Sequence, residues 1–232
     1  MDHASKDEQH RDIASGGFRA ALFGLADGLV TNASLILGFA GANPGHSLVR
    51  LAGIGGLVAG AFSMATGEYI SVQSQKELFE YEIEVERKAL EASPEEELRE
   101  LVAIFQKRGV ELDVAERLAT DLMRNPDLAL RTHAREELGI DPDSLAQPWV
   151  AAYSSFIWFS VGALVPLLPW LFTSRGDPLI LSLVLTAAAS ASVGGAVGWF
   201  THRGVIFSAL RSLVITTLAA GVTFAVGHLV GA

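Results

Sequence analysis

The sequence predicts an all-α, multi-pass membrane protein with five transmembrane helices and a cytoplasmic helical domain inserted between the second and the third. Two observations carry this prediction. Five apolar blocks each reach the length of about 20 residues that a helix needs to span a bilayer, and most charges lie elsewhere. Half of the 232 residues are hydrophobic and the mean hydropathy is +0.36. Residues 74–148 hold 10 basic and 19 acidic residues, whereas the rest of the chain holds 7 of each, so the net charge of −9 belongs to this one segment.

This composition excludes several classes of protein. The chain has no basic surplus, which a nucleic-acid binder needs, and its apolar blocks exclude a soluble globular enzyme. The absence of cysteine excludes disulfide frameworks, cysteine zinc sites and thiol catalysis. The sequence also lacks a Gly-x-Ser-x-Gly elbow, a phosphate-binding loop and a His-Glu-x-x-His motif. We therefore expect no enzymatic activity and no prosthetic group.

The apolar blocks set the predicted spans in chain order. The first contains a single acidic residue, Asp27, and the second contains Glu68. The five spans are residues 19–41, 51–71, 149–172, 178–200 and 207–230. The predicted domains are residues 1–73, with an N-terminal lead and two spans, the acidic segment 74–148, and residues 149–232, with three spans.

The basic residues of the connections predict the orientation of the spans. The acidic segment carries ten basic residues and the link between spans four and five carries Arg203 and Arg211, whereas the other two links carry one each. Because basic residues collect on the cytoplasmic side, we expect the N-terminus and the acidic segment in the cytoplasm. Residues 1–15 do not form a signal peptide. This plain N-terminus and the lack of cysteine favour a bacterial inner membrane over a vacuolar-type membrane.

Helix start and stop signals predict that the acidic segment is helical. The second span continues into it without a helix breaker. A capping box at Ser93, followed by a proline at the first helical position, starts a new helix that should stop at Gly109. Asp113 starts the next helix. Asn125 with its following proline starts a third, which ends near Gly139.

Asp27 and Glu68 lie where apolar composition gives no reason for a charge. A charged side chain deep in a bilayer costs at least about 3 kcal/mol, so it normally faces a cavity or a partner and marks an ion or proton path. Glu68 follows Met64 by one helical turn, beside a face of small residues, and a carboxylate and a thioether can hold a metal ion in passage. The alternative is a packing face, with both carboxylates wetted by lipid headgroups and Met64 as ordinary packing.

A second candidate site lies in the acidic segment. Three helices each carry a pair of potential ligands spaced so that both share one face. Together they could build a carboxylate-rich site with an imidazole, suited to Fe²⁺, Mn²⁺ or Zn²⁺. The alternative is a set of solvated, glutamate-rich helices. The pairs are Glu82 with Glu86, Glu97 with Glu100, and His133 with Glu137.

These residues lie in a chain that resembles the vacuolar iron transporter family over nearly its whole length. The Asp-Gly block and the Ser-Met-x-x-Gly-Glu-Tyr block, in this order around five spans and an acidic insert, are specific. The matching segments are Ala26–Leu29, Gly41–Asn43, Ala59–Tyr69, Glu97–Glu100, Glu136–Gly139 and Pro166–Pro169.

The resemblance implies a homodimer that exchanges Fe²⁺, and often Mn²⁺, for protons along a path lined by the first two spans at the dimer interface. Asp27 and Met64 match path residues of the family. The residues that match glutamates of its cytoplasmic metal-binding domain are Glu86, Glu97, Glu100 and Glu137.

Three positions depart from the pattern of eukaryotic members. Ala89 replaces a glutamate, and Glu82, one turn earlier, is the candidate to substitute for it. His133 replaces a methionine, and because imidazole is a harder ligand than a thioether, we expect a different preference for metals. Gly56 replaces an acidic residue early in the second span, so Glu68 is expected to take more of the proton-coupling role.

We therefore expect a transporter that moves Fe²⁺ or Mn²⁺ out of the cytoplasm by proton antiport, with metal ions, protons and membrane lipid as partners. A membrane-anchored metal sensor or storage scaffold is the alternative. A third hypothesis is a transporter of another cargo, with the acidic segment serving as a dimer contact.

Overall fold

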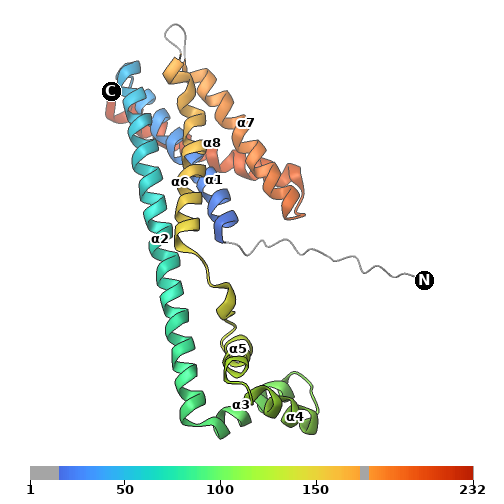
Figure 1. The fold of residues 1–232 in the computed structure, drawn as a ribbon. Helices are drawn as coiled ribbons and strands as arrows, with labels where there is room; N and C mark the ends of the chain where they lie inside the picture. Colours follow the sequence, from blue (N-terminus) through green and yellow to red (C-terminus); the bar gives the residue numbers. More distant parts are fainter. Residues whose placement is uncertain (1–15, 173–177, 232) are drawn as a thin grey trace, which may run out of the picture. The chain divides into compact units, whose positions relative to one another are not determined.

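The computed structural model describes residues 16–172 and 178–231, and these residues form helices and connections without a strand. The predicted N-terminal lead, residues 1–15, and the link at 173–177 lie outside the described residues. In chain order the elements are α1 (Gly16–Gly41), α2 (His46–Ala92), α3 (Pro94–Lys107), α4 (Leu112–Met123), α5 (Pro126–Glu136), the short 3-10 helix η1 (Pro142–Ser144), α6 (Pro148–Phe172), α7 (Pro178–Phe200) and α8 (Val205–Gly231) (Figure 1).

Five of the described helices are long and apolar enough to cross a membrane: α1, α2, α6, α7 and α8. This confirms the predicted all-α fold with five membrane-length helices. The chain divides into two compact units. The spanning unit comprises the chain up to Ile70 together with Pro148 onward, and the insert unit comprises Ser71–Gln147. Helix α2 contributes its first part to the spanning unit and its remainder to the insert unit.

Helices α1 and α6 form the most extensive contact of the spanning unit, and glycines let their backbones meet. A Cβ atom on Gly28 would stand 2.1 Å from the carbonyl oxygen of Phe159, and one on Gly162 would stand 2.2 Å from that of Leu25. Small residues permit such close crossings in membranes. Asn32, which is fully buried, adds a hydrogen bond from its Nδ2 to the carbonyl oxygen of Ala163 at 2.7 Å.

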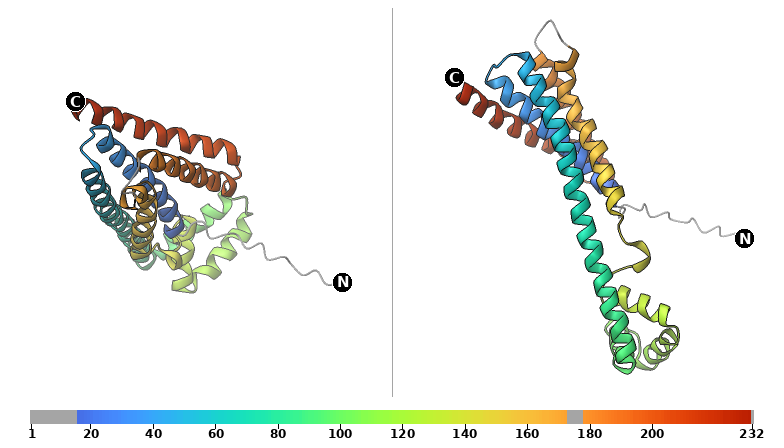
Figure 2. Two further views of the ribbon diagram at one scale, coloured as in Figure 1. Left: turned by 90° about the horizontal axis from the view of Figure 1, so that it is seen from above. Right: turned by 60° about the vertical axis from the view of Figure 1, so that its left-hand side comes forward.

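Helices α7 and α8 run side by side in the spanning unit (Figure 2). Hydroxyl groups link them, since Ser190 Oγ lies 2.8 Å from Thr216 Oγ1 and 3.0 Å from Ser212 Oγ. Gly198 packs against Ser208, where a Cβ atom would come within 2.7 Å of the serine side chain. The small residues of α7 at this contact therefore form a packing face.

The small residues of α2 face two directions. Gly53 and Gly60 face the rest of the spanning unit, because Cβ atoms there would meet Leu167 and the ring of Phe159. A second row, which we call the α2 stripe, is exposed and repeats every fourth residue. The α2 stripe consists of Gly55, Ala59, Ser63 and Gly67.

In the insert unit, α3, α4 and α5 lie together on one side of the C-terminal end of α2 (Figure 1). The predicted stops at Gly109 and Gly139 are confirmed, with φ angles of +91° and +66° that suit glycine. Asn125 caps α5 as predicted, since its side chain accepts hydrogen bonds from the backbone of Asp127 and Leu128.

Two predicted details of the insert unit are wrong. Ser93 stands at the N-cap of α3, but its side chain makes no capping hydrogen bond. Its backbone carbonyl accepts bonds from Glu96 and Glu97 instead, and the proline at the first helical position fixes the start. Helix α4 begins at Leu112, one residue before the predicted Asp113, which instead binds Arg117 one turn later.

Candidate metal centre

Four side chains from three helices of the insert unit converge on one point. Each offers one ligand atom, and these atoms all lie within 4.8 Å of one another. His133 is central: its Nδ1 lies 3.1 Å from Glu86 Oε1, 3.7 Å from Glu97 Oε2 and 3.8 Å from Glu137 Oε2. Glu86 comes from α2, Glu97 from α3, and the other two from the C-terminal end of α5.

Two of the four side chains are buried, Glu97 is half-buried and Glu137 is exposed, and the buried ligand atoms lack hydrogen-bond partners. His133 is 0% exposed and Glu86 is 7% exposed. Neither ring nitrogen of His133 has a hydrogen-bond partner, and neither does Glu86 Oε1. The 3.1 Å contact between His133 Nδ1 and Glu86 Oε1 does not have the geometry of a hydrogen bond. Buried polar atoms normally find a partner, so this arrangement suits a cation that all four side chains can share.

Burial and mutual repulsion change the acidity of these groups. The pKa of Glu86 is raised to about 7, first by desolvation and then by the charges of Glu137, Glu97 and Glu100. Desolvation is also the main cause that raises the pKa of Glu97 and of Glu137. It lowers the pKa of His133, which favours the neutral imidazole that can act as a ligand.

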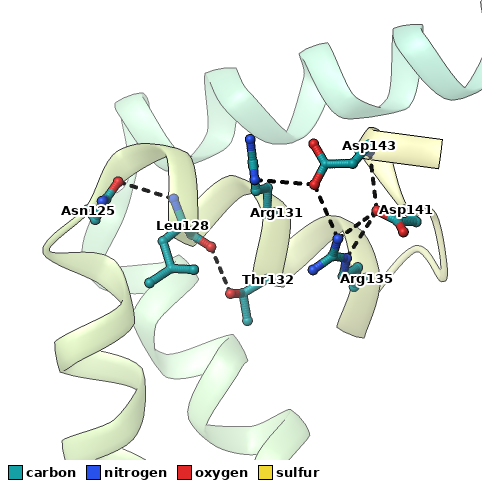
Figure 3. A network of polar contacts seen from close by, with 7 residues as sticks. All are labelled: Asn125, Leu128, Arg131, Thr132, Arg135, Asp141 and Asp143. Atoms are coloured by element: carbon teal, nitrogen blue, oxygen red, sulfur yellow. Dashed lines mark hydrogen bonds and ion pairs between the residues drawn. The ribbon is translucent and has the colours of Figure 1, made fainter. Parts of the chain in front are cut away.

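A network of ion pairs fixes the end of α5 that carries His133 and Glu137. Arg135 lies 2.7 Å from Asp141 and 3.2 Å from Asp143, and Arg131 also reaches Asp143 at 3.2 Å (Figure 3). These contacts join α5 to η1, the next element in the chain. At the other end of α5, the cap at Asn125 satisfies the first backbone amides.

The donor set indicates the class of metal. Three carboxylates and one imidazole offer hard and borderline ligands, which suit Mn²⁺, Fe²⁺ and Zn²⁺. Of the six predicted residues, the structure brings together Glu86, Glu97, His133 and Glu137. Glu100 lies close enough to raise the pKa of its neighbours but is outside the group. Glu82 is outside it as well, and Ala89 contributes no ligand.

The three predicted path residues each have a different neighbour in the spanning unit. Asp27 is half-buried and accepts a hydrogen bond from Thr31 Oγ1 at 3.3 Å. Met64 packs against the buried cluster that includes Phe159. Glu68 forms an ion pair with Arg19, whose Nη2 lies 2.7 Å from Glu68 Oε1.

Sequence reasoning missed Arg19 and Asn32. Arg19 stands at the edge of the first apolar block, and a basic residue at this edge was the available signal. The structure also explains how Gly56 is accommodated. A Cβ atom there would come within 2.4 Å of Leu35 Cδ2 and 2.7 Å of Asn32 Oδ1, so α1 fills the space that a larger side chain would need.

A comparison with known proteins agrees with this architecture. A family model described as the VIT family matches residues 18–228. The chain belongs to the VIT family. The resemblance stated from the sequence is therefore confirmed.

Three relatives of this VIT-family chain match over most of their length. The vacuolar iron transporter of Acanthamoeba castellanii is 36% identical, and the match covers 96% of this chain and 82% of that protein. Vacuolar iron transporter 1 of Arabidopsis thaliana is 30% identical, with 91% and 85% covered. Vacuolar iron transporter 2 of Oryza sativa is also 30% identical, with 89% and 84% covered. These relatives are named as transporters, which agrees with the expectation that the chain is not an enzyme.

Proposed function

We propose that this protein transports Fe²⁺, and also Mn²⁺, out of the cytoplasm in exchange for protons. The observation that carries the proposal is the cluster of Glu86, Glu97, His133 and Glu137. Its buried members, Glu86 and His133, have unpartnered ligand atoms that suit a divalent cation. A second observation is the presence of carboxylates within membrane-length helices, where they normally mark an ion path. The names of the relatives agree with iron as cargo.

The proposed route begins at the metal centre, which we place in the cytoplasm from the bias of basic residues. From there the ion passes Glu68, Met64 and Asp27 in turn. The acidic surface of the insert unit raises the local concentration of cations. We favour a bacterial inner membrane because the sequence has no cysteine.

Proton coupling follows from competition for the same oxygen atoms. A carboxylate must lose its proton before it binds metal, and it regains a proton when the metal leaves. In the path, Asp27 and Glu68 can alternate in this way. No separate proton channel is then required, and the proton gradient drives metal export.

We also propose that the protein works as a homodimer with α2 at the interface. The α2 stripe supports this, because its small residues are exposed, repeat every fourth position and would let a second helix approach closely. Cβ atoms on Gly55 and Gly67 would meet nothing within 4 Å, so the protomer leaves this surface uncovered. The path residues Met64 and Glu68 lie next to the α2 stripe in sequence.

Flux measurements in proteoliposomes test the transport proposal. Purified protein is reconstituted with a metal-quenched dye inside, and Mn²⁺ uptake is followed with and without a pH gradient. We expect uptake that the gradient accelerates, and we expect Asp27→Ala to abolish it while the protein stays folded. Thr31→Val serves as a matched control because it removes the hydroxyl partner and leaves the carboxylate. Undiminished uptake by Asp27→Ala would refute the proposed path.

The same experiment separates transport from a sensor or storage scaffold. The double variant Glu97→Ala, Glu100→Ala should weaken metal binding and slow uptake at low metal concentration. If it weakened metal binding while no version of the protein gave flux, the chain would be a scaffold.

A further inference from the structure

One ion pair joins the two helices that carry the proposed path. Arg19, in the first turns of α1, donates a hydrogen bond from Nη2 to Glu68 Oε1 on α2 at 2.7 Å. Both residues belong to the spanning unit. Among the residues of this unit that the structure describes, Asp27 and Glu68 are the acidic ones, so the pair neutralises one of the two carboxylates available to a passing cation.

The two partners differ in burial. The side chain of Glu68 is 12% exposed and that of Arg19 is 67% exposed. The carboxylate is therefore held within the protein, whereas the guanidinium reaches it from outside on a long, flexible stem. Rotation of this stem would release Glu68 without movement of either helix, so Arg19 is the partner that can leave.

We propose that Arg19 is a tethered counter-cation that occupies Glu68 until a divalent metal ion displaces it, and that it thereby selects divalent over monovalent cations. This inference rests on the proposed function, which places Glu68 in the path. Arg19 is a specificity-determining residue in this account, and it contributes no ligand to the metal.

Charge explains the selectivity. A divalent ion at the same distance attracts a carboxylate twice as strongly as a single positive charge does. A sodium or potassium ion gains no such advantage over the guanidinium, which also forms a directional hydrogen bond and has the high effective concentration of a tethered group. Monovalent ions, although abundant, are thus excluded from Glu68.

The competing interpretation is a structural clip that fastens α1 to α2. The two interpretations predict different effects on transport when Arg19 and Glu68 are substituted separately. If the pair is a clip, Arg19→Gln and Glu68→Gln break the same contact and impair transport alike. If Arg19 competes with the metal, Arg19→Gln lowers the apparent KM for metal, whereas Glu68→Gln raises it.

The test measures Mn²⁺ uptake by the full chain in proteoliposomes. Uptake in sodium chloride is compared with uptake in choline chloride at equal ionic strength. For Arg19→Gln we expect the apparent KM to fall by about three- to tenfold, the range of one charged hydrogen bond at a partly exposed site. We also expect sodium to inhibit this variant and to leave the wild type unaffected. Arg19→Lys keeps a cation and should retain the exclusion of sodium, which provides a second variant if Arg19→Gln fails to fold.

Three results would overturn the proposal. A higher KM in both Gln variants, together with insensitivity to sodium, would identify a clip. A KM for Arg19→Gln equal to that of the wild type would show that the guanidinium does not compete. Absence of metal flux in the wild type would overturn the proposed function and this inference together. If the wild type transports metal and Asp27→Ala abolishes that transport, the proposed function stands, and either of the first two results then overturns only the role of Arg19.

Discussion

At the scale of single residues, the cost of burying charge governs the candidate metal centre. Three carboxylates surround one neutral imidazole, and their mutual repulsion adds to desolvation, so Glu86 holds its proton up to about pH 7. A cation relieves both penalties at once, because it neutralises the carboxylates and supplies the partner that His133 lacks. A metal ion at this centre would therefore compete with a proton at Glu86 within the physiological pH range.

The first prediction concerns the pH dependence of metal binding. Because the pKa of Glu86 is raised to about 7, its ionised fraction rises from roughly one tenth at pH 6 to roughly nine tenths at pH 8. We expect Mn²⁺ affinity, measured by calorimetry on the full chain in detergent, to rise by about tenfold over this interval. Glu86→Gln should flatten the profile. Glu84→Gln, an exposed neighbour paired with Arg87, should leave it intact, and a steep profile in Glu86→Gln would contradict the assignment.

The raised pKa of Glu86 also determines how the stability of the metal-free protein changes with pH. A carboxyl whose folded-state pKa is raised contributes stability that is fully present below its ordinary pKa of 4.5 and is lost as the pH rises through about 7. We expect amide hydrogen exchange in α5 of the metal-free protein, corrected for the intrinsic pH dependence, to show weaker protection at pH 8 than at pH 5. Added Mn²⁺ should restore protection at pH 8, since it binds the ionised form. Protection that increases with pH in the absence of metal would contradict the raised pKa.

At the scale of secondary-structure elements, helix ends and glycine contacts position the functional side chains. The cap at Asn125 and the ion pairs of Arg135 hold α5 at its two ends (Figure 3). The short distance between α1 and α6 depends on positions where no Cβ atom fits. These local features can be tested separately from metal binding.

Two cap positions provide a matched pair of variants. The side chain of Asn125 accepts two backbone hydrogen bonds at the start of α5, whereas Ser93 at the start of α3 makes none. We expect Asn125→Ala to destabilise the insert unit by about 1 kcal/mol and Ser93→Ala to have little effect. Hydrogen exchange at the two helix starts measures both. Equal effects of the two variants would contradict the structure at these caps.

Gly28 tests the contact between α1 and α6. A Cβ atom there would stand 2.1 Å from the backbone oxygen of Phe159, which cannot move without its helix. We expect Gly28→Ala to destabilise the protein by about 1–3 kcal/mol, as overpacking does, in thermal unfolding in detergent. Gly221→Ala is the control, because its Cβ atom would meet nothing within 4 Å. An unchanged unfolding midpoint for Gly28→Ala would contradict the described crossing.

At the scale of the whole molecule, α2 belongs to both units. It carries Met64 and Glu68 in the spanning unit and Glu86 in the insert unit. It also carries the α2 stripe, the surface that we assign to the second protomer. In a membrane, lipid covers exposed large apolar side chains, so their exposure does not indicate a protein partner. An exposed row of small residues, by contrast, is typical of helix association.

The last prediction concerns this assembly. Ser63→Leu places a branched side chain in the middle of the α2 stripe and should keep the second helix at a distance. We expect the variant to shift from dimer to monomer in light scattering in detergent, and to lose metal flux with it. Val222→Leu, on the exposed face of α8, is the control and should remain dimeric. A stable, active dimer of Ser63→Leu would place the interface elsewhere.

The sequence by itself determined the five spans, the helical insert, the stops at Gly109 and Gly139 and the cap at Asn125. These features are local: the length of an apolar block, a glycine that tolerates a positive φ, and a side chain within reach of the next turn each act over a few residues. The sequence also nominated the acidic candidates, because helical spacing identifies which side chains share a face.

Only the tertiary structure decided which candidates meet. Helical spacing treats Glu82 and Glu86 alike, but the packing of α3 and α5 against α2 selects Glu86. The tertiary structure likewise divided the small residues of α2 into a packed row and an exposed row. It also brought Glu68 to Arg19, a partner 49 residues away in the chain. Such convergence depends on how distant segments bury one another's surface, which no local pattern encodes.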